Sequence, residues 1–111
     1  MRNRPGLGEF EQLVLLAILN LGTAAHANQI RERIGELAKR PVSRGALYAT
    51  LDRLETKGFL SYALEEGGPA RGGIPRRRFV VTASGVGALR QSLAAVRALA
   101  SGLERIVGHA G

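Results

Sequence analysis

Apolar residues recur at helical spacing in the first half of the chain, which predicts helices there. Over residues 9–21 they repeat every three or four positions, and further apolar residues make this segment apolar on most sides. Such a helix is expected in the centre of a small domain or at a subunit interface. A second helix is expected from Ala27 or Asn28 to Ala38. Its expected inward positions are Ile30, Ile34, Leu37 and Ala38.

The next helical segment has start and stop signals at both ends. Ser43 is a favourable N-cap residue, and Gly58 is a favourable residue immediately after a helix. Between them, over residues 44–57, leucines recur at the spacing i, i+4, i+7, namely Leu47, Leu51 and Leu54. This pattern predicts a third helix with one buried face.

Two strand-like segments follow, at residues 59–64 and 79–81, separated by a stretch rich in Gly, Pro and Arg. They predict a β-hairpin with an extended tip. Thr82 can then cap a last helix from Ala83 to about Val107. A helix-turn-helix followed by a basic hairpin is a winged helix, so the expected fold is mainly α with a small β-hairpin. The expected parts are a flexible basic arm over 1–7, a winged helix-turn-helix domain over 8–82, a dimerisation helix over 83–107 and a disordered tail over 108–111.

The last helix carries a heptad-like seam whose members are spaced 3, 4, 3, 4, 3 and 4 residues apart. Its members are Val86, Leu89, Leu93, Val96, Ala100, Leu103 and Val107. A helix of this length spans about 37 Å at ~1.5 Å per residue, more than one small core needs to cover. The seam therefore predicts a homodimer. The alternative is that it packs only within its own subunit, with Leu99 and Ile106 docking on the first helix.

Composition narrows the class of partner. The 111 residues include 16 Lys and Arg against 9 Asp and Glu, a net charge of +7, and no Cys. The positive charge favours an anionic partner such as nucleic acid, although basic surfaces also bind membranes and acidic proteins. The absence of Cys excludes disulfides and thiolate metal sites. The longest apolar run, residues 13–19, is too short to span a bilayer, and no secretory signal is present, so we expect a cytoplasmic protein.

The third helix and the hairpin carry the candidate binding residues. The outward face of the helix begins with small residues, flanked by Arg44 and Tyr48. A helix whose first turns carry small outward side chains can approach the DNA major groove closely, although Gly45 could merely allow packing against another helix. In the hairpin, Arg71, Arg76, Arg77 and Arg78 place four positive charges within eight residues. This clustering favours nucleic acid over a solvated turn.

No enzyme site is visible in the sequence. The two histidines are far apart in the sequence: His26 lies in the expected turn between the first two helices and His109 in the expected tail. No catalytic triad, metal-ligand cluster or cofactor loop can be assembled, so we expect no catalytic residues, no metal and no cofactor.

The segment 43–60 resembles the PadR family of transcriptional regulators, whose pattern is S-x-G-x-L-Y-x-x-L-x-x-L-x-x-x-G followed by two hydrophobic residues. Every fixed position is filled, and residues 7–11, 72–77 and 82–85 also look like the family. The resemblance implies a cytoplasmic homodimeric repressor that binds double-stranded DNA with the third helix in the major groove and the wing on the backbone or minor groove. Where many members have Tyr-Gly at the start of the second helix, this sequence has His26-Ala27. The residues expected at DNA are Ser43, Arg44, Gly45, Tyr48, Ala49, Arg53, Arg71, Arg76, Arg77 and Arg78.

Two other function classes stay open beside the repressor. The same winged helix could be an interaction module that binds an acidic protein, and an enzyme is the weakest alternative. Regulation of a repressor could come through a small hydrophobic effector in the dimer groove near Phe10, Val14 and the last helix. A partner protein or the protein concentration could serve instead.

Overall fold

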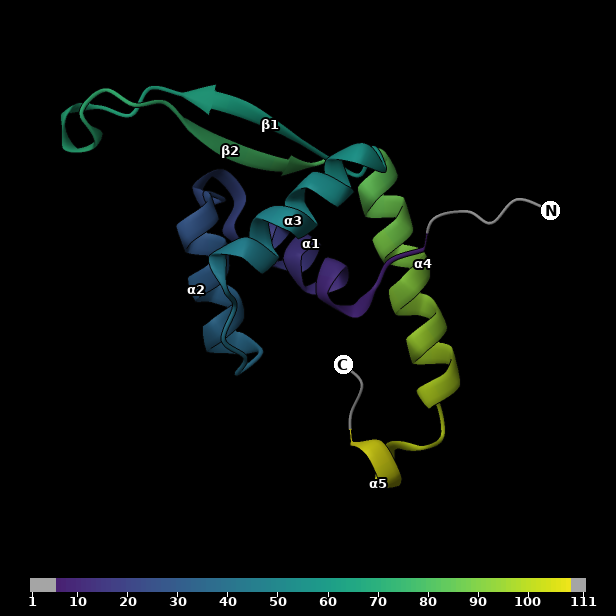
Figure 1. The fold of residues 1–111 in the computed structure, drawn as a ribbon. Coiled ribbons are helices and arrows are strands. Elements are labelled where there is room, and N and C mark those ends of the chain that lie inside the picture. Colours follow the sequence, from purple (N-terminus) through teal and green to yellow (C-terminus); the bar gives the residue numbers. More distant parts are fainter. Residues whose placement is uncertain (1–5, 109–111) are drawn as a thin grey trace.

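The structure, a computed structural model, describes residues 6–108. Its elements are α1 (Glu9–Leu21), a 3-10 turn (Gly22–Ala24), α2 (Ala27–Leu37), α3 (Arg44–Thr56), β1 (Leu60–Glu65), a second 3-10 turn (Pro69–Arg71), β2 (Arg76–Val81), α4 (Ala83–Ala100) and α5 (Glu104–Val107) (Figure 1). The predicted class, mainly helical with one small hairpin, is confirmed. Residues 1–5 of the expected arm and 109–111 of the expected tail lie outside the described residues.

The predicted helix boundaries around α3 are confirmed. Ser43 Oγ accepts a hydrogen bond from the backbone N–H of Ala46 at 3.0 Å. At the other end, Phe59 N–H bonds to the carbonyl of Leu54 and Gly58 N–H to the carbonyl of Glu55, both at 2.9 Å. This is a Schellman motif, and the positive φ of +80° at Gly58 is what it requires. The cap and the stop together fix both ends of α3.

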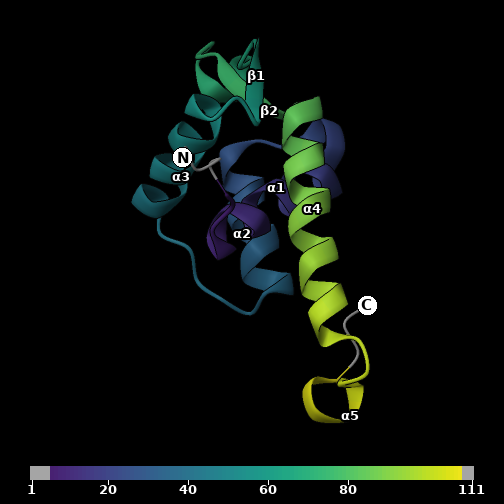
Figure 2. The ribbon, with the colours of Figure 1, turned by 90° about the vertical axis from the view of Figure 1, so that its right-hand side faces the viewer.

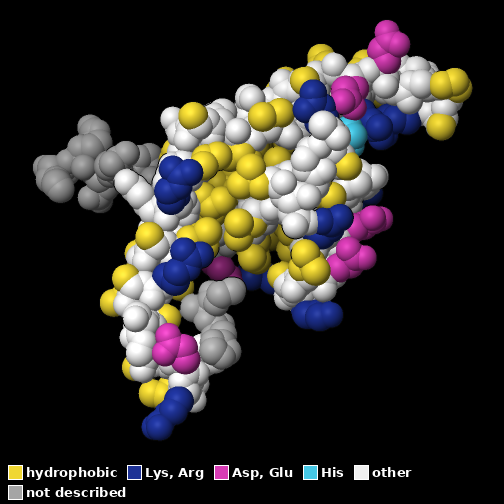
Figure 3. Space-filling view, turned by 180° about the vertical axis from the view of Figure 1, so that it is seen from behind, with side chains coloured by type: hydrophobic (Ala, Val, Ile, Leu, Met, Phe, Trp, Pro, Cys, Tyr) yellow, Lys and Arg dark blue, Asp and Glu magenta, His cyan; other side chains and the backbone are white. Residues whose placement is uncertain are grey.

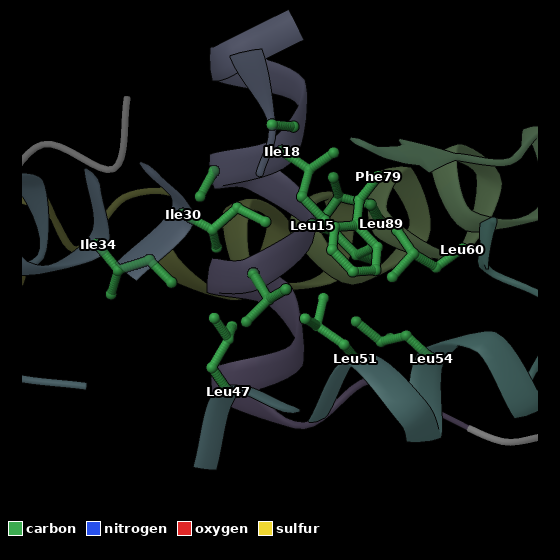
Figure 4. Close-up of a cluster of buried hydrophobic side chains, with 13 residues drawn as sticks. Leu15, Ile18, Ile30, Ile34, Leu47, Leu51, Leu54, Leu60, Phe79 and Leu89 are labelled. Carbon is green, nitrogen blue, oxygen red and sulfur yellow. The ribbon is translucent and has the colours of Figure 1, made fainter. Parts of the chain in front are cut away.

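The core is built around α1, as its apolar pattern predicts (Figure 4). Val14 and Leu15 on α1 are fully buried. The leucines of α3 pack against α1 from one side, Ile30 and Ile34 of α2 from another, and Phe79 of the hairpin from a third. Leu37 and Ala38 were expected to point inward, but both are exposed. They lie at the end of α2, where no other element covers them.

The hairpin forms the wing, which projects beyond α2 and α3 (Figure 1). Its strands pair antiparallel, from Leu60 opposite Val81 to Glu65 opposite Arg76. The second strand begins at Arg76, three residues earlier than predicted, so the three consecutive arginines lie within the strand and not in the tip. The backbone N–H of Phe79 also bonds to the carbonyl of Ala25 at 2.9 Å, which ties the wing to the segment before α2.

The prediction of one continuous last helix is wrong. It ends at Ala100, and a turn at Ser101 and Gly102 separates it from the short α5. Gly102 has φ +84°, which an α-helix excludes, and glycine is costly within a helix. Residues 94–99 are all exposed, and Figure 2 shows the C-terminal end of α4 and α5 projecting past the rest of the domain, so core packing within the described residues does not hold the helix through this sequence.

The apolar seam changes from buried to exposed within α4, after Leu93. Leu89 is buried in the core, Leu93 packs against it and Val86 is half-buried, whereas Val96, Leu103 and Val107 are exposed. The side chains of Leu99 and Ile106 are both 80% exposed, so they do not dock on α1 of their own chain. None of the helices within residues 6–108 has the length and apolar character needed to cross a membrane.

Candidate nucleic-acid interface

The N-terminal half of α3 presents an exposed strip of small side chains. The strip consists of Ser43, Gly45 and Ala49, all of which are exposed. Arg44, which is also exposed, and Tyr48, which is half-buried, lie beside it. A Cβ built on Gly45 would meet no atom within 4 Å among the described parts of the chain. Gly45 therefore serves no helix packing inside this subunit. The strip is free to approach another surface closely.

A polar cleft of about 260 Å³ lies beside this strip, between the start of α2, the start of α3 and the wing. It is lined mainly by donors: His26, Asn28, Gln29, Arg44, Tyr48, Arg71, Arg76 and Arg77. The first turn of α2 has no side-chain cap, in contrast to α3. Its N–H groups and the arginines give the cleft a positive field, which suits an anion.

Glu65, at the end of β1, joins the wing to the start of α2. Its Oε1 accepts a hydrogen bond from His26 Nε2 at 2.8 Å, and its Oε2 accepts one from Arg78 Nε at 2.8 Å. Arg76 Nε lies 3.8 Å from Oε1. The hydrogen bond from His26, and then that from Arg78, lowers the pKa of the Glu65 carboxyl. Two of the wing arginines therefore already have a carboxylate partner.

Arg77 points toward the other side of the wing, where its guanidinium lies over aromatic rings. The distances from Cζ to the ring centroids are 5.0 Å for Tyr62, 5.2 Å for Phe79 and 6.0 Å for Tyr48. Arg77 Nη1 is also 3.7 Å from Glu55 Oε2 on α3. This residue joins the wing to α3.

The sequence profile of the family described as the transcriptional regulator PadR-like family matches residues 15–91 of this winged helix. The chain belongs to the PadR-like family of transcriptional regulators. Among solved structures, a PadR-like transcription factor from Bacteroides fragilis is 28% identical, with 87% of this chain and 88% of that chain covered and a TM-score of 0.69. No curated protein matches the chain.

Two further solved structures share the fold. A PadR family transcriptional regulator from Eggerthella lenta is 24% identical, with 89% and 86% of the two chains covered and a TM-score of 0.66. A PadR family regulator from Clostridium difficile R20291 is 18% identical, with 91% and 100% covered and a TM-score of 0.72. These two likenesses show the fold, and it is the family match that makes the chain a DNA-binding transcriptional regulator.

In this PadR-like regulator, the residues predicted at DNA fall into two groups. The first group lies on the strip or lines the cleft: Ser43, Arg44, Gly45, Tyr48, Ala49, Arg71, Arg76 and Arg77. Within this group, Arg76 and Arg77 also lie within 4 Å of a carboxylate. Arg53 and Arg78 form the second group, which is engaged within the subunit and does not line the cleft. Arg53 donates to Thr50 Oγ1 at 2.9 Å and lies 3.6 Å from Glu11 Oε2.

Sequence reasoning missed three polar residues that line the cleft, His26, Asn28 and Gln29, as well as the apolar Ala27, Pro75 and Phe79. The position of the three polar residues in the sequence could have indicated them, because they stand at the start of the second helix. In a helix-turn-helix, the N-terminus of the helix before the recognition helix is placed to contact the DNA backbone. His26 was left without a role, and the structure places it as the N-cap residue of α2 and a partner of Glu65.

An apolar hollow of about 340 Å³ lies between α1 and α2 of the single chain, lined by Leu13, Leu16, Ala17, Asn20, Arg33, Ile34, Leu37 and Ala38. Of the residues named for an effector groove at the dimer, Phe10 is half-buried and Val14 is fully buried within its own subunit. Figure 3 shows apolar side chains gathered on the face behind the view of Figure 1, beside α4. Over residues 6–108, no group of three or more His, Cys, Asp or Glu could hold a metal ion.

Proposed function

We propose that this chain is a homodimeric transcriptional repressor that binds a pseudo-palindromic operator. The observation that carries this proposal is the smooth, exposed start of α3 beside an arginine-lined cleft. A recognition helix enters the major groove with its N-terminal residues near the base edges. Gly45 and Ala49 let the α3 backbone approach closely. Arg44 can bind guanine or phosphate, and Tyr48 supplies a flat ring with a hydroxyl.

The cleft accounts for the backbone contact. Arg71 and Arg76 reach it from the wing, and the uncapped N–H groups of α2 reach it from the opposite side. A phosphate in this position would complete the hydrogen bonding of the α2 N-terminus and fix the register of α3 in the groove. The cleft therefore serves positioning, and the strip on α3 serves sequence recognition.

The exposed half of the seam supports a dimer. Val96, Leu99, Leu103 and Ile106 form an apolar arm that nothing covers within residues 6–108. Contiguous exposed apolar surface of this kind marks a protein contact. A twofold dimer would present two copies of α3 to half-sites about one helical turn, ~34 Å, apart. Of the predicted seam residues, Val96, Leu103 and Val107 are exposed and stay proposed for this contact, whereas Leu89 is only 4% exposed and belongs to the core of its own subunit.

Substitution of Gly45 by Gln tests the proposal. The variant Gly45→Gln has room for its side chain and gains helix propensity, so it is expected to fold as stably as the wild type. It is expected to lose at least tenfold in operator affinity, about 1.4 kcal/mol, because the new side chain holds α3 away from the bases.

The matched control is Ala98→Gln, an exposed position on α4 away from the seam, which is expected to bind normally. Both variants are compared by fluorescence anisotropy with an operator duplex and by thermal unfolding. Unchanged operator binding by Gly45→Gln would show that α3 does not enter the groove.

A further inference from the structure

Arg77 has an environment unlike that of the other wing arginines. Its guanidinium lies 5.0–6.0 Å from three aromatic ring centroids, and its Nη1 is 3.7 Å from Glu55 Oε2. Arg71 at the tip is exposed instead: its Nε donates to the carbonyl of Ile74 at 3.3 Å, and it has no carboxylate partner within the part of the chain that the structure describes. Arg77 also lines the cleft, but it is the wing arginine whose guanidinium is surrounded by three rings as well as a carboxylate, and a charge in that position is poorly placed to bind phosphate.

The contacts of Arg77 join three elements. Tyr62 and Phe79 come from opposite positions of the two wing strands, whereas Tyr48 and Glu55 come from α3. Tyr48 and Glu55 are seven residues apart, two helical turns, so they lie on one face of α3. One arginine from β2 therefore reaches two residues, two turns apart, on the face of the recognition helix toward the wing. Tyr62 and Phe79 pack with ring centroids 6.1 Å apart and stabilise the strand side of this contact.

We propose that Arg77 is a positioning residue of the DNA interface: it holds the wing on α3 and orients the Tyr48 ring toward DNA, and it does not neutralise a phosphate itself. This inference rests on the proposed function. Tyr48 lies between the exposed strip of α3 and the cleft, so the direction of its ring decides what the strip presents. Loss of Arg77 therefore acts on operator recognition through Tyr48.

The salt dependence of binding separates positioning from phosphate contact. Each neutralised phosphate contributes about 0.9 to the slope of log K against log salt. Arg71→Ala is the control, with an expected decrease of about 0.9 in the slope. Arg77→Ala is expected to keep the wild-type slope and yet lose about fivefold to tenfold in the ratio of operator to shuffled-duplex affinity. A decrease of about 0.9 for Arg77→Ala would overturn the inference.

Two further variants sharpen the test. Arg77→Lys keeps the charge but loses the planar stack, so it is expected to behave like Arg77→Ala, whereas a phosphate contact would be restored by Lys. In a double-mutant cycle, Arg77→Ala is expected to cost nothing further once Tyr48→Ala is present, because both changes remove the same contact. Additive losses would refute the coupling.

A measurement on the free protein keeps this inference separate from the proposed function. In NMR spectra, the side-chain protons of Arg77 are expected to be shifted upfield by the rings, and the Tyr48 ring signals are expected to move in Arg77→Lys. Unshifted Arg77 protons would overturn the arrangement whether or not DNA binds. Wild-type protein that binds no duplex would refute the proposed function, and the spectra would still decide whether Arg77 holds Tyr48.

Discussion

Lys57, at the end of α3, holds the recognition helix to the start of α1. Its Nζ donates to both carboxylate oxygens of Glu11 at 2.9 Å and to the carbonyl of Gly6 at 2.8 Å. The Glu11 side chain is only 7% exposed and also accepts a hydrogen bond from the backbone N–H of Gly8 at 2.8 Å. The substitution Lys57→Met removes the main cationic partner and leaves this carboxylate buried.

The expected loss of stability follows from the burial of the pair. Removing one partner of a fully buried ion pair costs about 3–5 kcal/mol. The Lys57 side chain is 22% exposed, and Arg53 stays 3.6 Å from the carboxylate, so we expect a smaller loss. We expect Lys57→Met to lower the free energy of unfolding by about 2 kcal/mol. This loss corresponds to a decrease of roughly 8–16 °C in Tm for a domain of this size.

The loss is also expected to depend on pH. Burial raises the pKa of Glu11, but the hydrogen bond from Lys57, the Gly8 N–H and the charges of Lys57 and Arg53 outweigh it, so the pKa lies below its ordinary value. A carboxylate whose pKa is lowered by folding stabilises the protein above its unfolded pKa of about 4.3, and this stabilisation is lost as the pH falls through the folded value. The difference in unfolding free energy between Lys57→Met and wild type should therefore have its largest value at pH 7 and decrease below about pH 4.

Urea unfolding followed by circular dichroism measures this difference at each pH. The matched control is Lys39→Met, because Lys39 is exposed and has no carboxylate partner in the described portion of the chain. The control is expected to unfold like the wild type. If Lys57→Met is as stable as wild type at pH 7, or if its loss persists unchanged in acid, the Glu11–Lys57 pair does not stabilise the fold as argued.

Two other predictions concern the helix that follows the wing. A Cβ at Gly85 would lie 2.3 Å from the backbone carbonyl oxygen of Phe59, so Gly85→Ala is expected to lower the unfolding free energy by about 2 kcal/mol or more. Gly87→Ala meets no atom within 4 Å and should be neutral or stabilising, and equal behaviour of the two in thermal unfolding would contradict the packing of α4. Leu99→Asp changes a side chain that is 80% exposed in one subunit, so it should leave the fold intact and weaken self-association at least tenfold. Sedimentation velocity checks this prediction, and an unchanged dimer would show that the arm is not the interface.

Local signals predicted much of the fold. The boundaries of α1 and the start of α3 follow from an apolar period, a serine cap and a glycine stop, all of which act within a few residues. The strip on α3 was also predictable, because helical geometry alone places Arg44, Gly45 and Tyr48 on the outside. These features need no information about distant parts of the chain.

The remaining features depend on contacts between distant residues. His26 and Glu65 are 39 residues apart in sequence, and no local pattern brings them together. Arginine is not a strand signal, so the start of β2 at Arg76 comes from pairing with β1 and from the hydrogen bond of Phe79 to Ala25. The heptad spacing of the apolar residues continues past Gly102, which is why the sequence predicts one continuous helix. Because no packing surface supports the helix there within the described residues, the glycine ends it.

The central claim is that this PadR-like regulator binds a specific operator as a dimer. Fluorescence anisotropy with a labelled duplex from upstream of its own gene, beside a shuffled duplex at three salt concentrations, tests this claim most directly. We expect tight binding to the first duplex that saturates at two chains per site and falls steeply with salt, and at least a hundredfold weaker binding to the second. Equal and weak binding to both duplexes would contradict the claim and favour an acidic protein as the partner.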